Sequence, residues 1–280
     1  MTRTSTVRHL DRPLEAVVAA NSQRHPHTGD RLRIAERLVS LVAPASFAAD
    51  QYRGLRHTVE RLRRESDLQV LAVTSPGPGD GKSVTTLNLA GALAQSPDAR
   101  ILVIDADLRK PSVGEYLGLG THRSPGLADA LADRTLDLAR IARRIDGFNL
   151  WAVPAGAPQR SPYELLNSPR LEALLAEARR QYDCVLVDTP PFITLPDCRV
   201  IERSVDGFFI VVAAHRTPRK MLAEVMTLLQ PSKLLGVVFN ADDRPGSDYY
   251  GYSGYYGSQA TGHPVWWQRL KDTLRGTGSR

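Results

Sequence analysis

The fold of this 280-residue chain is decided by the stretch Val73-Thr74-Ser75-Pro76-Gly77-Pro78-Gly79-Asp80-Gly81-Lys82-Ser83. A β-like run precedes this stretch and a helical pattern, Val84 to Ala94, follows it. Glycines allow successive backbone N–H groups to face one set of phosphate oxygens, and a helix N-terminus adds partial positive charge. The strict pattern G-x-x-x-x-G-K-S is missed, because Pro76 stands where the first glycine belongs. A glycine-rich turn before a helix is the alternative, but we predict a nucleotide-phosphate loop formed by Gly77, Gly79, Asp80, Gly81, Lys82, Ser83 and Val84.

Two further apolar runs end in carboxylates. The first, 100–111, ends in Asp105, Asp107 and an arginine, and the second, 183–191, ends in Asp188. Continuous apolar runs indicate parallel strands buried on both faces, whose carboxyl ends gather at one edge of the sheet. Any one aspartate could instead be a helix N-cap, but three in this arrangement predict a site beside the loop. There Lys82 would reach the β- and γ-phosphates of ATP, and Ser83 would bind Mg²⁺.

Strand and helix patterns alternate along the rest of the chain. We expect strands at 69–74, 101–105, 148–153, 184–188, 207–213 and 234–239, and helices at 47–64, 82–95, 126–133, 135–144, 162–180, 196–203 and 217–230. This alternation predicts an α/β fold with a doubly wound, mostly parallel sheet of the P-loop NTPase type. We divide the chain into a loosely ordered basic arm (1–45, with a short helix expected at 31–41), a P-loop domain (46–242), a Gly/Tyr-rich tail (243–262) and a short amphipathic segment (263–280).

Composition narrows the classes of protein that remain. No apolar run approaches the length of a membrane span, and no signal peptide is visible. Two cysteines fit no metal spacing or disulfide framework, which favours a reducing cytoplasmic setting. The net charge of +6 suits an acidic partner or an anionic membrane surface, but no nucleic-acid motif is present and we expect no nucleic acid as a partner.

Five of the nine tyrosines gather in the tail, at Tyr249, Tyr250, Tyr252, Tyr255 and Tyr256. The pattern fits either phosphate acceptors or an aromatic binding surface. With the loop, 104–111 and 185–191, this cluster resembles the bacterial tyrosine autokinases (BY-kinases) of capsule and exopolysaccharide biosynthesis. The segments 125–131 and 162–167 also look like family segments. The resemblance covers about residues 49–256.

The resemblance implies a deviant Walker-type kinase that transfers the ATP γ-phosphate to tail tyrosines of a neighbouring subunit. It also implies a ring-like homo-oligomer, a separate membrane adaptor of the polysaccharide co-polymerase type, and recruitment from the cytoplasm to the inner face of the plasma membrane. The family's oligomerisation motif E-x-x-R-x-x-R reads Asp50, Arg53 and Arg56 here, with aspartate for glutamate. An ordinary basic helix face is the alternative reading of these three residues.

Within that mechanism we assign roles to individual residues. Lys82, Asp105, Asp107 and Asp188 are the candidate catalytic residues, with Asp105 accepting or orienting the tyrosine proton. Ser83, Asp107 and Asp188 are the candidate Mg²⁺ ligands. Arg109 would neutralise phosphate or hold a subunit contact. Asn240, at the end of the last strand, would contact adenine or simply cap that strand.

Two other functions share these features. A Min- or Par-type positioning ATPase has the same fold but carries a lysine where this chain has Gly77, and it lacks a tyrosine cluster. A nucleotide-binding scaffold without catalysis is the other alternative.

Overall fold

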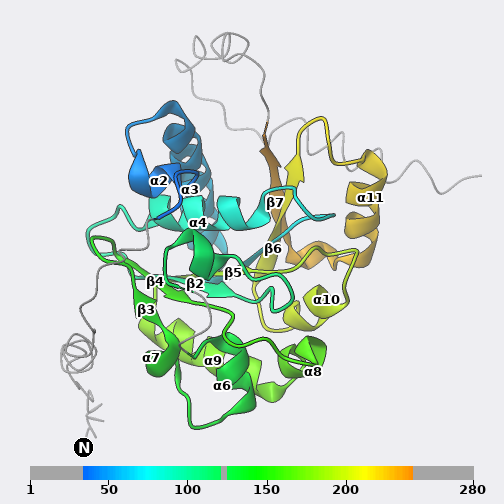
Figure 1. The fold of residues 1–280 in the computed structure, drawn as a ribbon. Coiled ribbons are helices and arrows are strands. Elements are labelled where there is room, and N and C mark those ends of the chain that lie inside the picture. Colours follow the sequence, from blue (N-terminus) through cyan, green and yellow to red (C-terminus); the bar gives the residue numbers. More distant parts are fainter. Residues whose placement is uncertain (1–33, 121–124, 242–280) are drawn as a thin grey trace, which may run out of the picture. The chain divides into compact units, whose positions relative to one another are not determined.

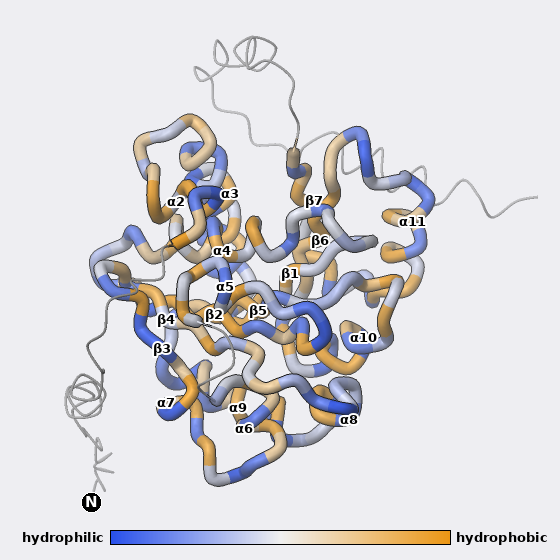
Figure 2. The backbone as a smooth tube through the Cα atoms, in the orientation of Figure 1, coloured by the Kyte–Doolittle hydropathy of each residue, from blue (hydrophilic) through white to orange (hydrophobic). Residues whose placement is uncertain are grey.

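Four strands at the centre of the sheet are fully buried, as their uninterrupted apolar runs predict. The computed structural model describes residues 34–120 and 125–241. The buried strands are β1 (Val70–Thr74), β2 (Ile101–Asp105), β5 (Cys184–Asp188) and β6 (Gly207–Ala213). β4 (Leu150–Val153) and β7 (Leu234–Asn240) flank them, and β3 (Arg143–Arg144) adds a two-residue strand. In Figure 2 hydrophobic segments gather at the strands in the middle of the fold.

The sheet has the order β3-β4-β2-β5-β1-β6-β7, and only the β3–β4 pair is antiparallel among the described strands. This arrangement confirms the predicted mostly parallel α/β sheet. Its register matters for function, because Asp188 of β5 lies opposite Asp105 of β2 on one side and Val73 of β1 on the other. The loop after β1 therefore begins beside both carboxylates.

Helices cover both faces of the sheet (Figure 1), and each face has its own hydrophobic core. One core holds α2 (Val39–Val42), α3 (Phe47–Ser66), α4 (Lys82–Leu93) and α5 (Val113–Tyr116). The other holds α6 (Leu127–Ala132), α7 (Leu138–Ile141), α8 (Pro162–Leu166), α9 (Pro169–Gln181), α10 (Asp197–Ile201) and α11 (Arg219–Leu228). A 3₁₀ turn, η1 (Pro231–Lys233), leads into β7.

Three sequence expectations need correction. The helix expected at 135–144 is reduced to α7, and its last two residues form β3. The helix expected at 162–180 is two helices, because Pro169 restricts Ser168 to an extended backbone and starts α9 as its first residue. The loosely ordered arm was also extended too far, since 34–45 is folded.

The 34–45 segment is held on the first core by side chains and backbone. Leu38 is fully buried, and the Asn88 side chain on α4 accepts from Ser40 N (2.9 Å) and donates to Arg37 O (3.0 Å). Residues 34–45 therefore belong to the P-loop domain. The rest of the expected arm, 1–33, and the expected tail segments after 241 lie outside the described residues.

No helix in 34–120 or 125–241 combines the length and apolar character that a membrane crossing requires.

Candidate phosphate-binding and catalytic site

The predicted phosphate loop connects β1 to α4, with Lys82 as the first residue of the helix. Gly79 and Gly81 have φ angles of +83° and +93°, which residues with a Cβ adopt only at a cost. The N–H groups of the first helical turn have no partner within their own helix. All the predicted loop residues, Gly77 to Val84, thus lie around one helix N-terminus that favours a bound anion.

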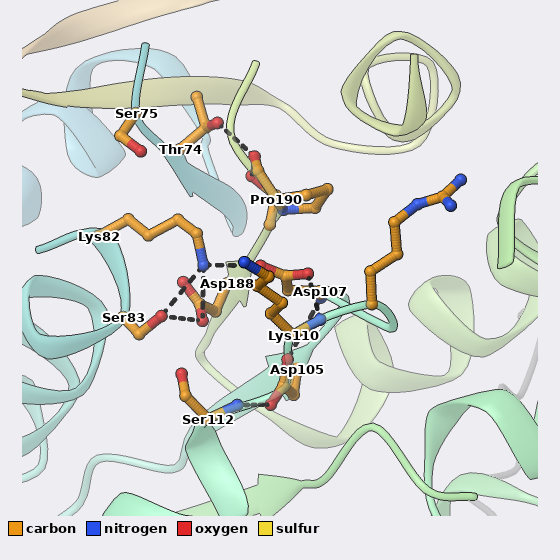
Figure 3. A network of polar contacts seen from close by, with 12 residues as sticks. Thr74, Ser75, Lys82, Ser83, Asp105, Asp107, Lys110, Ser112, Asp188 and Pro190 are labelled. Atoms are coloured by element: carbon orange, nitrogen blue, oxygen red, sulfur yellow. Dashed lines mark hydrogen bonds and ion pairs between the residues drawn. The ribbon is translucent and has the colours of Figure 1, made fainter. Parts of the chain in front are cut away.

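The Lys82 side chain lies between two carboxylates (Figure 3). Its ammonium group lies 2.9 Å from Asp107 Oδ2 and 3.8 Å from Asp188 Oδ2, and its side chain is 12% exposed. The two aspartate side chains are 4% and 0% exposed. The structure therefore brings together the lysine of the loop and the carboxylates that follow two neighbouring strands, as the strand-end pattern predicts.

Ser83 completes this cluster. Its hydroxyl donates to Asp188 Oδ2 at 2.6 Å and accepts from Lys82 Nζ at 3.2 Å. Thr86, one helical turn later, donates to Lys82 O (2.8 Å) and to Asp188 Oδ1 (3.4 Å). Asp188 is thereby fixed by two hydroxyl groups and one ammonium group.

Asp105 has a different environment from the other two aspartates. Its Oδ2 accepts from the backbone N–H groups of Ser112 (2.9 Å) and Val113 (3.0 Å), and its Oδ1 accepts from Asp107 N (3.2 Å). Both oxygens therefore hold the loop between β2 and α5, which presents Asp107 to Lys82. This contact gives Asp105 a structural role in addition to the predicted one.

Burial and charge shift the pKa values of the cluster. Burial raises the pKa of Asp105 to about 8 with help from the Asp188 charge, and the backbone donors only partly oppose it. Burial raises the pKa of Asp188 to about 6, although the Lys82 charge and the Ser83 hydroxyl lower it. Burial alone would lower the pKa of Lys82, but the Asp188 and Asp107 charges outweigh burial and raise it. Lys82 stays an ammonium group and holds Asp188 in its charged form near neutral pH.

The polar groups of the Lys82 cluster suit a nucleoside triphosphate with Mg²⁺. A hydroxyl and two carboxylates, on Ser83, Asp107 and Asp188, offer the hard oxygen ligands that Mg²⁺ prefers, and Lys82 offers a cation for phosphate oxygens. The loop packs closely against β7 at Gly81, because a Cβ on Gly81 would lie 2.0 Å from the Asn240 amide nitrogen. The residues therefore fit both groups.

Asn240, expected to contact adenine or to cap the last strand, lies against the loop. Its Nδ2 donates to Asp80 O at 2.9 Å. The β6–α11 turn adds two contacts on the same side, since Thr217 Oγ1 donates to Asp80 Oδ1 (2.7 Å) and Arg216 Nη2 donates to Gly79 O (2.6 Å). Sequence reasoning missed Thr217 and Arg216, although they follow a predicted strand at the same edge as the aspartates.

Arg109 pairs with Asp197, a residue outside the Lys82 cluster. Its guanidinium group contacts Asp197 at 2.9 Å, and Asp197 is 1% exposed while Arg109 is 37% exposed. The hydrogen bond to Asp197 and the Asp197 charge raise the pKa of Arg109. This pair ties the loop after β2 to the start of α10.

The expected oligomerisation motif lies on α3, where its residues make contacts within the chain. Arg53 pairs with Asp50 (2.6 Å) and donates to Pro44 O (2.8 Å). Arg56 pairs with Glu60 (2.7 Å) and donates to Ala92 O (2.9 Å). Arg53 and Asp50 are the more exposed pair and so are better placed than Arg56 for a subunit contact. The five tail tyrosines lie outside the described residues.

Comparison with known proteins places this site in a family. Residues 71–248 match the CobQ/CobB/MinD/ParA nucleotide binding domain. The tyrosine-protein kinase YwqD of Bacillus subtilis is 30% identical over 224 residues, which cover 79% of this chain and 93% of that protein. The chain belongs to the bacterial tyrosine-kinase family.

Other family members agree with this assignment. The kinase domain of Escherichia coli tyrosine kinase ETK superposes with a TM-score of 0.71 at 25% identity and covers 87% of this chain and 90% of that structure. The succinoglycan biosynthesis transport protein ExoP of Rhizobium meliloti is 30% identical over 249 residues, 86% of this chain but 31% of that protein. This kinase-family chain therefore spans nearly all of the Bacillus relative and about a third of the Rhizobium one.

Proposed function

We propose that this chain is an ATP-dependent protein-tyrosine kinase that phosphorylates its own tail tyrosines. The acceptors would be Tyr249, Tyr250, Tyr252, Tyr255 and Tyr256, on a neighbouring subunit. The observation that carries the proposal is the Lys82 cluster, in which a loop lysine, a loop hydroxyl and two strand-end carboxylates meet at a helix N-terminus. Phosphoryl transfer needs positioning and charge neutralisation more than covalent chemistry by the protein, and this cluster supplies both.

In the reaction the phenol oxygen of a tyrosine forms a bond to the γ-phosphorus of ATP, and the bond from that phosphorus to the β,γ-bridging oxygen breaks. Lys82 would leave the carboxylates to hold the β- and γ-phosphate oxygens, and the loop N–H groups would hold the rest. Ser83, Asp107 and Asp188 would hold Mg²⁺, which neutralises charge on the phosphates. The phosphate ends on the tyrosine and ADP leaves.

The phenol proton needs an acceptor, and two carboxylates are candidates. Asp105 was predicted for this role, but three backbone N–H groups already occupy its oxygens. Asp107 directs Oδ2 toward Lys82 and so toward the phosphates. Because Asp107 is also a candidate Mg²⁺ ligand, Asp107→Asn is assayed over a range of Mg²⁺ concentrations: loss of a metal ligand raises the Mg²⁺ concentration needed for half the maximal rate, whereas loss of the base lowers kcat at saturating Mg-ATP. Asp105→Asn lowers kcat if Asp105 is the base and only the unfolding midpoint if it is a loop anchor.

The proposed setting follows from the relatives. ExoP is named for succinoglycan biosynthesis transport, so we assign this chain to the control of exopolysaccharide or capsule synthesis and export. A ring-like homo-oligomer would bring each tail to a neighbouring site, with Asp50, Arg53 and Arg56 at the contact. A separate membrane adaptor of the co-polymerase type would recruit the chain to the inner face of the plasma membrane, where the positive net charge favours anionic lipid.

The test is peptide mass spectrometry of the full chain after incubation with Mg-ATP. Phosphate on the peptide spanning 249–256, and none in Lys82→Met, supports the kinase. ATP hydrolysis without tyrosine phosphate supports a Min- or Par-type ATPase instead. Nucleotide binding without turnover, unchanged when an adaptor's cytoplasmic segment is added, supports a scaffold.

A further inference from the structure

Asp80 is a buried acid in the middle of the phosphate loop. It is 6% exposed, and its two oxygens face the protein: Oδ2 accepts from Gly77 N at 3.2 Å and Oδ1 accepts from the Thr217 hydroxyl at 2.7 Å. A carboxylate so close to a triphosphate site would repel the ligand if it faced that site. The side chain of Asp80 therefore holds the loop, and only the backbone of Asp80 is left to face a phosphate.

Thr217 uses both hydrogen-bonding capacities of its hydroxyl. The oxygen donates its proton to Asp80 and accepts from Ala213 N at 2.8 Å, while Thr217 N donates to Ala213 O at 3.0 Å. Ala213 is the last residue of β6, a fully buried strand. Thr217, 137 residues after Asp80 in the chain, thus connects the phosphate loop to a buried strand of the sheet.

Two neighbouring side chains also hold the loop, by hydrogen bonds to its backbone carbonyls. Arg216 holds the carbonyl of Gly79, and Asn240 holds the carbonyl of Asp80. In a trans peptide the C=O of one residue and the N–H of the next point in opposite directions. Because these two carbonyls point toward the β6–α11 side, the N–H groups of Asp80 and Gly81 point to the opposite side of the loop. A phosphate on that opposite side could accept hydrogen bonds from them.

We infer that Thr217 is a positioning residue of the nucleotide site, which fixes the phosphate loop in its binding conformation through Asp80. The inference rests on the nucleotide-binding part of the proposed function. A loop ordered before the ligand arrives loses less conformational freedom on binding, so the contact contributes to affinity without touching the ligand. Removal of the hydroxyl should weaken nucleotide binding before it affects the reacting groups.

The test is the Kd of the full chain for Mg-ADP, measured by isothermal titration calorimetry. Thr217→Val keeps the shape of the side chain and removes the hydroxyl, and we expect Kd to rise about tenfold, the size of effect typical for a hydrogen bond to a charged group. Thr217→Ser keeps the hydroxyl and should bind within about twofold of the wild type. Thr227→Val is the matched control, because Thr227 is an exposed threonine on α11 whose hydroxyl donates to Ala223 O at 2.9 Å.

A double-mutant cycle separates positioning from general destabilisation. In an Asp80→Ala background, Thr217→Val should leave Kd unchanged, because the group through which Thr217 acts is gone. It should still lower the unfolding midpoint, because Ala213 N loses its acceptor in either background. In the wild-type background kcat should change less than KM for ATP.

Two results would overturn the inference: a Thr217→Val chain that binds Mg-ADP like the wild type, or a loss of affinity that is equally large in the Asp80→Ala background. A wild-type chain that binds no Mg-ADP at all would instead remove the proposed function, and this inference with it.

Discussion

Replacement of Lys82 by Met should destabilise the nucleotide-free chain as well as abolish phosphoryl transfer. Lys82 Nζ is the cation next to Asp107 and Asp188, whose side chains are 4% and 0% exposed. Without it, two buried carboxylates face each other with no compensating charge. Breaking a buried ion pair on one side typically costs about 3–5 kcal/mol of unfolding free energy.

The unfolding free energy that Lys82→Met loses should depend on pH, and the direction of this dependence follows from the pKa shifts. In the wild type the pKa of Asp188 is raised to about 6, even with the Lys82 charge lowering it. In Lys82→Met that opposing charge is absent, so the pKa of Asp188 rises further. The pKa of an aspartate in the unfolded chain is about 3.9. When the pKa is higher in the folded state, the stability of the protein falls as pH rises toward and through the folded-state value. The deficit of the variant should therefore be largest near pH 8 and should shrink toward pH 5.5, by about 1.4 kcal/mol for each further unit in the pKa of Asp188.

The assay is urea unfolding at pH 5.5 and pH 8.0, with EDTA and without nucleotide. Lys220→Met, which removes an exposed lysine from α11, is the control for loss of a positive charge. Lys82→Met/Asp188→Asn should lose most of the pH dependence, because one of the two facing carboxylates is gone. Equal stability of Lys82→Met and wild type at both pH values, or a larger deficit at pH 5.5, would refute the reasoning.

Three further predictions concern stability. Burial acts to raise the pKa of Asp206, but the Arg179 guanidinium and two backbone N–H groups outweigh burial and lower the pKa. The stability that Asp206 contributes is therefore present above about pH 4 and is lost as pH falls. In urea titrations, Asp206→Asn should lose less unfolding free energy than the wild type between about pH 5 and pH 3. Gly81→Ala should cost about 2 kcal/mol in thermal unfolding, because φ is +93° and the new methyl group would push the Asn240 amide away from its hydrogen bond to Asp80 O. Leu38→Ala should cost about 2–5 kcal/mol in urea unfolding, because Leu38 is fully buried in the core formed with α4.

Each of these variants has a control or a contradicting result. Gly147→Ala keeps the positive φ, +82°, but meets no atom within 4 Å, so a loss as large as that of Gly81→Ala would mean that the contact with Asn240 is unimportant. Val42→Ala truncates an exposed residue of α2 and should cost little; if Leu38→Ala costs equally little, residues 34–45 do not belong to the folded domain. A wild-type chain and Asp206→Asn that lose stability in parallel below pH 5 would remove the assigned role of Asp206.

The sequence predicted the sheet and most of the site for a simple physical reason. Strands buried on both faces read as continuous apolar runs, and in a parallel sheet their carboxyl ends meet at one edge. That rule was sufficient to bring Asp105, Asp107 and Asp188 near Lys82, and the structure agrees.

What the sequence could not show depends on contacts between distant segments. β3 is two arginines without an apolar pattern, and it becomes a strand only by pairing with β4. The apolar residues of 34–45 show no clear periodicity, so the sequence does not reveal that Leu38 and Leu41 pack on α4. Thr217 looks like any residue at the start of a predicted helix until the fold places its hydroxyl 2.7 Å from Asp80 Oδ1. Local pattern gives the elements and their ends, but tertiary proximity decides which polar side chains become partners.

The central claim is that this chain transfers phosphate from ATP to its own tail tyrosines. The most direct measurement is peptide mass spectrometry of the full chain incubated with Mg-ATP, with Lys82→Met alongside at a temperature where circular dichroism shows that the variant is folded. We predict several phosphates on the peptide spanning 249–256 of the wild type and none on the variant. Equal phosphorylation of the two chains, or none on the wild type even with an adaptor's cytoplasmic segment present, would contradict the claim.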